Sequence, residues 1–186
     1  MSLSPAEAMP QTAVETVYEN PWFAVRRRAP YHWIEQAHAG AVLVLQRADQ
    51  TIALVRHHRM AAGVALWEFP RGGAKTGETL AACAAREGGE ETGYTVDRST
   101  VKLLGPIYPD AGLIATRVEA YVGRTTTLRA RRRANPDAVE RGDIHDLMWV
   151  PPDHLAGLIR QGEIADGFTL SAWALWSVLQ PTRPRR

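Results

Sequence analysis

The sequence predicts an α/β protein in which a mixed β-sheet carries helices on its faces and follows a small N-terminal β extension. Three observations support this class. Strand-like segments lie both before and after residues 79–92, which have a helix-like composition, and two further helix-like segments close the chain. The 186 residues, 45% of them hydrophobic, are enough for one full core. We therefore expect an extension over residues 1–39, a main domain over residues 40–180 and a basic tail over residues 181–186.

Four strands are expected before the central helix. Residues 14–18 and 22–28 mix β-branched and aromatic side chains, as strands do. Residues 40–46 form an apolar run, GAVLVLQ, and residues 51–55 follow a turn-like Ala-Asp-Gln sequence. Together these segments predict a sheet that is largely built before the helix begins.

After the central helix, three more strands and two helices are expected. The strand candidates are residues 101–108, 117–122 and 144–150. The helices are residues 152–160, with a proline at a permitted early position, and residues 168–179, bounded by Pro181. This order supports a mixed sheet covered by helices.

Composition excludes several classes of function. A net charge of +2 argues against a dedicated nucleic-acid binder. We interpret the arginines near Pro136 and the PTRPRR ending as a solvated loop and a tail rather than an RNA or anion site. No stretch approaches the about 18 apolar residues of a membrane span, and no signal-peptide pattern is visible. We expect a soluble, cytoplasmic protein whose one cysteine, Cys83, is a small buried hydrophobe.

The most specific feature is an acidic motif with the spacing G-x5-E-x7-R-E-x-x-E-E-x-G. Its members are Gly72, Glu78, Arg86, Glu87, Glu90, Glu91 and Gly93. On a helix, Glu87 and Glu91 share a face at i and i+4, and Glu90 lies beside them. Like charges at this spacing repel, and a cation is the simplest compensation. Hard cations such as Mg2+ take oxygen ligands, and no His/Cys cluster offers a zinc alternative.

This motif resembles the Nudix box, the signature of hydrolases that cleave a nucleoside diphosphate linked to another moiety. The resemblance implies a Nudix α/β/α sandwich and a Mg2+ cofactor, with Mn2+ as an alternative. It implies that Glu87 and Glu91 are the principal metal ligands and catalytic groups. Glu90 and the main-chain carbonyl of Arg71 are further candidate ligands. Arg86 is implied to pair with Glu78 and to orient the ligands.

The chain departs from the family box at Gly88, where the family has an aliphatic residue. Gly89 follows, and each glycine inside a helix costs about 1 kcal/mol relative to alanine. The helix is therefore expected either to lie closer to its sheet or to be looser. Gly72 and Gly73 lie in the turn before the helix, where glycine permits close approach to phosphate. For Gly73, ordinary turn chemistry is an equal alternative.

The general base is expected outside the helix. In relatives that the chain resembles, an acidic residue on a loop before the last strand serves, and the matching segment here is ANPDAVERGDIHDLMWV. Glu140 and Asp143 are the candidates, with loop solvation as the alternative for each.

Three segments resemble ADP-ribose pyrophosphatases and related nucleotide-sugar hydrolases: VRHHRMAAGVALWEFPRGG, YPDAGLIATRVEAYVG and GEIADGFTLSAWAL. The resemblance places Arg59 at a diphosphate-binding arginine and Pro109 at a proline that marks ADP-ribose hydrolases. Two departures, Ala111 for a proline and Thr116 for a glutamate, leave the sugar open. Relatives pair their N-terminal strands across a two-fold axis, so a homodimer is expected, with Trp33 as the foremost candidate to stack on the base.

The first reading is therefore Mg2+-dependent hydrolysis of ADP-ribose or another nucleoside diphosphate sugar to a nucleoside monophosphate and a sugar phosphate. One alternative is hydrolysis of a different phosphoanhydride: a dinucleoside polyphosphate, NADH or a capped RNA end. Another is a sensor that binds ADP-ribose without turnover. Neither a membrane nor a nucleic-acid partner is expected.

Overall fold

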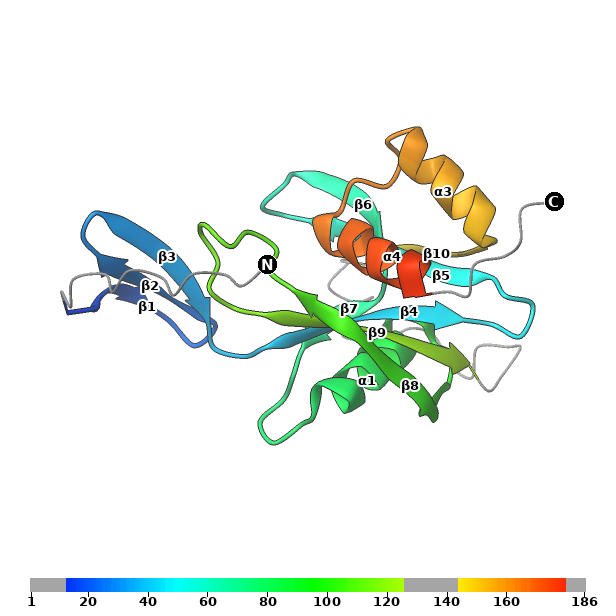
Figure 1. The fold of residues 1–186 in the computed structure, drawn as a ribbon, viewed down its shortest axis with the longest axis horizontal. Helices are drawn as coiled ribbons and strands as arrows, with labels where there is room; N and C mark the ends of the chain where they lie inside the picture. The colour runs from blue at the N-terminus through cyan, green and yellow to red at the C-terminus, as the bar shows by residue number, and fades with distance from the viewer. Residues whose placement is uncertain (1–12, 126–143, 180–186) are drawn as a thin grey trace, which may run out of the picture. The chain divides into compact units, whose positions relative to one another are not determined.

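The computed structural model describes residues 13–125 and 144–179 (Figure 1). The chain divides into two compact units. The first comprises Met1–Ala37 and Asp110–Thr116, and the second comprises His38–Pro109 and Arg117–Arg186.

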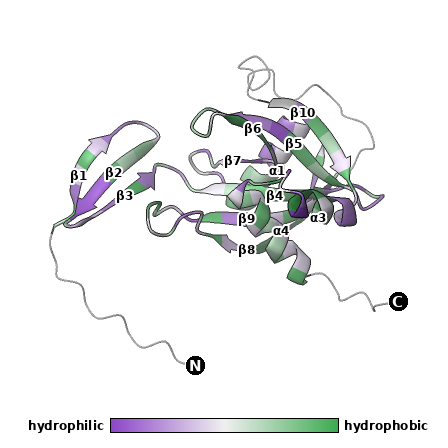
Figure 2. Cartoon of the chain, turned by 90° about the horizontal axis from the view of Figure 1, so that it is seen from above, coloured by the Kyte–Doolittle hydropathy of each residue, from purple (hydrophilic) through white to green (hydrophobic). Residues whose placement is uncertain are grey.

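The first unit is a three-stranded antiparallel sheet in the order β1 (Glu15–Glu19), β2 (Phe23–Arg28), β3 (Tyr31–Gln36). The segment Asp110–Thr116 lies along β3, where Ile34 N donates to the Leu113 carbonyl over 2.7 Å and Ala115 N donates to the Ile34 carbonyl over 2.9 Å. All five residues of β1 are exposed. Hydrophilic residues are frequent along β2 and β3 (Figure 2), so this sheet has only a small core of its own.

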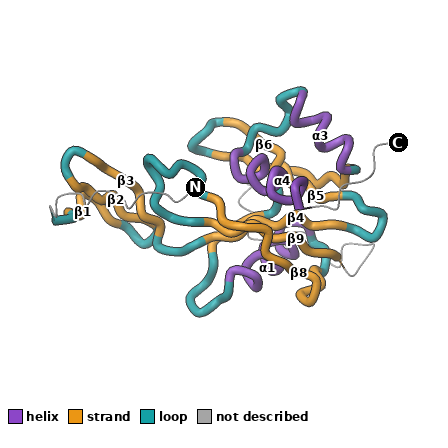
Figure 3. The backbone as a smooth tube through the Cα atoms, in the orientation of Figure 1, coloured by secondary structure: helices purple, strands orange, loops and turns teal. Residues whose placement is uncertain are grey.

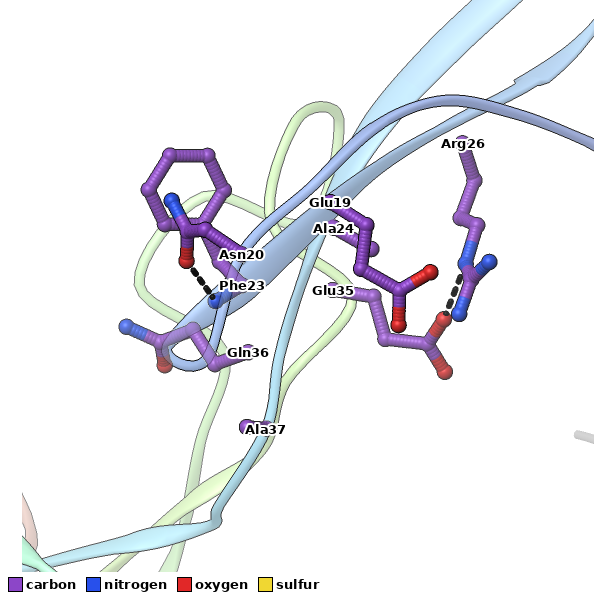
Figure 4. A pocket seen from close by; sticks show the side chains of 8 residues that line it. All are labelled: Glu19, Asn20, Phe23, Ala24, Arg26, Glu35, Gln36 and Ala37. Atoms are coloured by element: carbon purple, nitrogen blue, oxygen red, sulfur yellow. Dashed lines mark hydrogen bonds and ion pairs between the residues drawn. The ribbon is translucent and has the colours of Figure 1, made fainter.

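A cavity of about 230 Å3 lies on the first unit (Figure 4). Its walls include the Arg26–Glu35 ion pair, at 2.8 Å, and the turn in which Asn20 Oδ1 accepts a hydrogen bond from Phe23 N. None of the residues that the sequence predicts for catalysis or binding lines this cavity.

Among the described residues, the second unit has a seven-stranded mixed sheet and three helices. Its central path runs in the order β10-β5-β4-β9-β8, with β6 paired to β5 and β7 paired to β4. The elements are β4 (Gly40–Gln46), β5 (Ile52–Arg59), β6 (Val64–Glu68), β7 (Arg71–Gly73), α1 (Leu80–Thr92), β8 (Val96–Ile107), β9 (Val118–Thr125), β10 (Ile144–Val150), α3 (Pro152–Arg160) and α4 (Gly167–Leu179). The β4–β9 pair is parallel and the other pairs are antiparallel.

Alternating side chains of β4 divide the core between the two faces of this sheet. Val42 and Val44 face a cluster that contains Ala172 and Trp176 of α4, whereas Leu43 and Leu45 face a cluster that contains Cys83, Ala84 and Ala85 of α1. Figure 1 accordingly shows α1 on one side of the sheet and α3 and α4 on the other. The predicted α/β class with a mixed sheet is confirmed.

Most predicted segments appear with small shifts. The apolar run is β4, residues 144–150 and 152–160 are β10 and α3 as predicted, and α1 begins one residue after its predicted start. β5 extends to Arg59, β8 begins at Val96, and three strands were missed: β3, β6 and β7. β7 has three residues, two of them glycines, so it carries no strand signal of its own and forms through pairing with β4.

No helix among the described residues is long and apolar enough to cross a membrane. Cys83 is buried, as expected. The predicted general bases Glu140 and Asp143, most of the arginine cluster and the basic tail lie outside the described residues.

Candidate active site

The acidic motif is carried by a well-capped helix. Thr79 is the N-cap of α1, and its Oγ1 accepts a hydrogen bond from Ala82 N. Gly93 ends the helix in the left-handed conformation, with φ 73°, and donates its N–H to the Gly89 carbonyl. The first glycine of the motif lies on β7, before the loop that precedes α1 (teal in Figure 3). Two glycines thus bracket the segment that carries the glutamates.

Glu91 is the buried member of the acidic set. Glu91 is 7% exposed, and its Oε2 accepts a hydrogen bond of 3.2 Å from Arg71 N. Burial, and then the charge of Glu87, raise the pKa of Glu91 to about 8. Burial also raises the pKa of Glu87, against the hydrogen bond from Arg86. The positive charges near Glu87 and Glu91 do not offset the cost of burying the two carboxylates, so both pKa values stay raised.

Arg86 holds the rest of the motif together. Its Nε and Nη2 donate to the two oxygens of Glu78, at 2.9 and 2.8 Å, and Nη2 also donates to the Gly73 carbonyl at 2.9 Å. Its Nη1 reaches Glu87 at 2.7 Å and Glu90 at 3.1 Å. The hydrogen bonds from Arg86, and then the one from Lys75 N, lower the pKa of Glu78 to about 2. Arg86 thus fixes the loop relative to the helix, in contact with the acidic side chains.

Gly72 gives the Glu87 carboxylate its place. A Cβ built on Gly72 would lie 2.2 Å from both the carboxyl carbon and Oε1 of Glu87. No side chain fits there while Glu87 keeps its position. The motif therefore needs glycine at position 72, because the Glu87 carboxylate occupies the space that a side chain would fill.

Gly88 decides between the two alternatives left by the sequence. A Cβ on Gly88 would lie 2.5 Å from Leu43 Cδ2 and 3.3 Å from Val96 Cγ2, and both Gly88 and Leu43 are buried. The helix therefore lies close to its sheet, and Leu43 of β4 fills the space of the missing side chain.

A second charged cluster lies beside the acidic motif, and sequence reasoning found only part of it. Glu68 is fully buried, and it pairs with Arg59 at 2.5 Å and with Arg71 at 3.0 Å. Burial would lower the pKa of Arg59, but its bonds to Glu68 outweigh that effect and raise it. Asp166, also buried, lies 3.5 Å from Arg71. The sequence held a signal that could have identified both residues: Glu68 is the first residue of the E-F-P segment, and Asp166 is the first residue of the D-x-x-T segment.

The NUDIX domain family model matches residues 36–170, which is most of the chain. This chain belongs to the Nudix family. The acidic motif described above is its Nudix box.

Known proteins resemble this Nudix chain in sequence and in fold. The CMP-5'-(N-acetyl-N-hydroxy-3-aminopropyl)phosphonate hydrolase of Streptomyces rubellomurinus is 30% identical over 131 residues, covering 70% of this chain and 60% of that protein. GDP-mannose pyrophosphatase of an Enterobacter species is 28% identical over 145 residues, covering 73% and 71%. The crystal structure of an ADP compounds hydrolase superposes with a TM-score of 0.69 at 17% identity, covering 89% of this chain and 90% of that one. That likeness establishes the fold, and the chain spans only 60% of the length of the first relative.

The carboxylates of the Nudix box fit a hard divalent cation by their donor chemistry. All are oxygen donors, which Mg2+ prefers, and the charge of Glu87 helps to raise the pKa of the buried Glu91, a repulsion that a cation would relieve. Within the described ranges no three such side chains already converge in metal-binding geometry, because Arg86 holds both Glu87 and Glu90.

The predicted substrate-binding residues divide between the two units. Arg59, Gly72 and Gly73 lie in the second unit, with Arg59 anchored on Glu68. Pro109 follows β8 and is half-buried. Trp33 lies in β3 of the first unit, half-buried opposite Arg26. Thr116, also of the first unit, accepts a hydrogen bond from Gln36 N, so it has a local structural use.

Proposed function

We propose that this Nudix protein hydrolyses the pyrophosphate bond of a nucleoside diphosphate sugar such as ADP-ribose, with Mg2+ or Mn2+ as its cofactor. The products would be a nucleoside monophosphate and a sugar phosphate. The observation that carries this proposal is the buried Glu91, which lies with the half-buried Glu87 on one helix face and accepts a hydrogen bond from Arg71, whose side chain shares Glu68 with Arg59. Such a site suits a cation together with an anionic diphosphate.

Each residue of the site has a proposed part. Glu87, Glu90, Glu91 and the Arg71 carbonyl would hold the cation, which supplies charge neutralisation of the diphosphate when bound. Arg86 orients Glu87 and Glu90 through its two ion pairs. Arg59, whose guanidinium is fixed by Glu68, presents a positive charge to the diphosphate. Glu140 or Asp143 would accept the proton of the attacking water.

The relatives support a nucleotide substrate and leave its second half open. Their names specify a CMP-phosphonate conjugate, GDP-mannose and ADP compounds. The 30% identity to the CMP-phosphonate hydrolase makes such a conjugate the second candidate substrate. Thr116, which stands where the resemblance places a glutamate, is consistent with a terminal group other than ribose 5-phosphate.

A homodimer through the first unit remains part of the proposal. Apolar side chains on that unit are widely exposed: Tyr18 by 53%, Trp22 by 74% and Tyr31 by 60%. Burial of such a surface in a second copy would give it the partner that its own sheet lacks. Light scattering of the purified chain measures its mass, and a monomer at micromolar concentration would remove the dimer from the proposal.

The decisive experiment is a turnover panel in Mg2+ and in Mn2+ with products separated by chromatography. It contains ADP-ribose, ADP-glucose, GDP-mannose, a CMP-phosphonate, NADH, diadenosine polyphosphates and capped RNA. We expect a nucleoside monophosphate and a sugar phosphate from one of the nucleotide sugars. Saturable ADP-ribose binding without turnover of any compound would favour the sensor, and preferential cleavage of NADH, the polyphosphates or the cap would replace the proposed substrate class.

A further inference from the structure

The first turn of α4 makes a set of buried polar contacts that a helix start does not need. Asp166 stands just before α4, and its Oδ2 accepts hydrogen bonds from Thr169 N, at 2.8 Å, and from Thr169 Oγ1, at 2.7 Å. The first of these is an ordinary N-cap. The Thr169 hydroxyl also accepts a hydrogen bond of 2.9 Å from Phe69 N, a hundred residues earlier in the chain. Thr169 is fully buried.

The same turn also holds the side chain of Arg71. Asp166 Oδ1 lies 3.5 Å from Arg71 Nη2, and the Arg71 guanidinium carbon lies 4.4 Å from the centre of the Phe168 ring. Glu68 Oε2 also lies 3.0 Å from Arg71 Nη2 and accepts a hydrogen bond of 3.1 Å from Arg71 Nε. The segment from Phe69 to Arg71, which leads from β6 into β7, is therefore held at its main chain by Thr169 and at its arginine by Asp166 and Phe168.

The segment held by the α4 turn contacts both parts of the proposed site, the cation-binding carboxylates and the diphosphate-binding arginine. Arg71 N, in that segment, donates to Glu91 Oε2, the buried carboxylate of the Nudix box. Glu68, which shares Arg71 with Asp166, anchors Arg59 through three hydrogen-bond contacts. Buried polar groups of this kind transmit position because each has few alternative partners. A shift of the α4 turn would move Arg71 N and Glu68 together.

We propose that Asp166 and Thr169 are positioning residues of the reaction: by fixing the segment from Phe69 to Arg71, they set the places of Glu91 and Arg59. This inference rests on the proposed function, because it assigns Glu91 to the cation and Arg59 to the diphosphate. Neither Asp166 nor Thr169 needs to touch the substrate. Their effect is expected on cation affinity and turnover beyond any effect on stability.

The test removes the Thr169 hydroxyl with little change in shape. Thr169→Val deletes the link to Phe69 N, and Thr169→Ser keeps it. Two quantities are measured: kcat and KM on the best substrate of the panel, and the dissociation constant for Mn2+ without substrate, from the free-ion electron paramagnetic resonance signal. We expect Thr169→Val to weaken Mn2+ binding about tenfold and to lower kcat about 10- to 100-fold, with KM changed less than about threefold. Thr169→Ser is expected to restore both quantities to within about threefold of wild type.

Ile164→Val is the matched control. Ile164 is 2% exposed, lies in the loop just before Asp166 and packs its apolar side chain in the core, with no polar side-chain atom to contact the segment from Phe69 to Arg71. A purely structural role for Thr169 predicts that both variants change kcat and Mn2+ affinity alike once compared at equal distance below their Tm, and that result would overturn the proposal. Should Thr169→Val not fold, Asp166→Asn keeps an N-cap acceptor while it removes the charge facing Arg71. Weakened Mn2+ binding and lowered kcat in Asp166→Asn would then support the proposal, and wild-type values for both would overturn it.

The two proposals fail in different ways. If the wild-type protein turns over nothing in the panel, the proposed function is wrong. The Mn2+ comparison between Thr169→Val and Ile164→Val still decides the positioning role, since it uses no substrate. A Mn2+ affinity that is unchanged in Thr169→Val refutes the positioning role, whatever the turnover.

Discussion

The two charged clusters of this Nudix site are neighbours, but their charge balance differs. The cluster at α4 sets two buried carboxylates, Glu68 and Asp166, against two guanidinium groups, Arg59 and Arg71. The cluster at α1 and the loop before it sets four carboxylates against Arg86, with Lys75 4.0 Å from Glu90. The four are Glu78, Glu87, Glu90 and Glu91.

This difference separates scaffold from chemistry. Removing one partner of a buried ion pair strongly destabilises the folded protein. The α4 cluster is therefore expected to contribute to the stability of the fold. Buried carboxylates without matching cations cost folding free energy, which a bound divalent ion can offset. The same Glu→Gln substitution should therefore have opposite effects on stability in the two clusters.

Glu91→Gln is expected to have the largest effect on activity and to stabilise the cation-free fold. Loss of a ligand charge should lower kcat by at least about 100-fold. The folded pKa of Glu91 is about 8, above its ordinary 4.5, so its ionisation removes stability as the pH rises from 4.5 through 8. In EDTA, the variant should gain about 1–4 kcal/mol over wild type at pH 8 and little at pH 5. Urea denaturation at both values measures this, and a variant less stable than wild type at pH 8 would contradict it.

Glu68→Gln should have the opposite effect on stability. It leaves Arg59 without its buried carboxylate and Arg71 with Asp166 alone, which is expected to cost about 3 kcal/mol of unfolding free energy. Thermal unfolding in EDTA compares it directly with Glu91→Gln. If both variants shift Tm in the same direction, the contrast between a balanced and an unbalanced cluster fails.

Sequence reasoning found the unbalanced cluster and missed half of the balanced one. The glutamates of α1 are close in sequence, so helix periodicity alone places Glu87 and Glu91 together. Glu68 and Asp166 are almost a hundred residues apart, and only the packing of α4 against the segment from Phe69 to Arg71 brings them to the same arginine. The acidic loop that was predicted to hold the base lies outside the described residues, so that assignment stays a prediction.

The missed strands have a related cause. β6 and β7 form by pairing with β5 and β4, and β3 pairs with β2. Their stability comes from partners and not from an alternating pattern of their own. In contrast, β4 was located to the residue because both of its faces are buried, which gives a continuous apolar run.

Gly72→Ala tests the acidic cluster by changing its geometry while keeping its charges. The new methyl would overlap the Glu87 carboxylate, which must leave its place, so cation affinity and kcat should each fall about tenfold or more. Stability should change much less, because Glu87 is a side chain that can turn toward solvent. Gly167→Ala is the matched control, since its new Cβ would meet nothing within 4 Å. Equal Mn2+ affinity in the two variants would show that Gly72 does not hold a place for Glu87.

The smallest expected effect concerns how closely α1 lies on its sheet. Gly89→Ala should raise the unfolding free energy by about 0.5–1 kcal/mol, because the nearest atom to its new Cβ is the Tyr94 carbonyl oxygen at 3.4 Å and alanine favours the helix. Gly88→Ala gains the same propensity but meets Leu43 at 2.5 Å inside a closed core, so its net change should be a loss of about 1 kcal/mol. Adding Leu43→Val should recover part of that loss, with a coupling energy of about 1 kcal/mol in the double-mutant cycle. Additive effects would mean that the helix can move away from β4. In that case α1 could shift to make room for the alanine methyl group, and close packing of Leu43 against Gly88 would not be required.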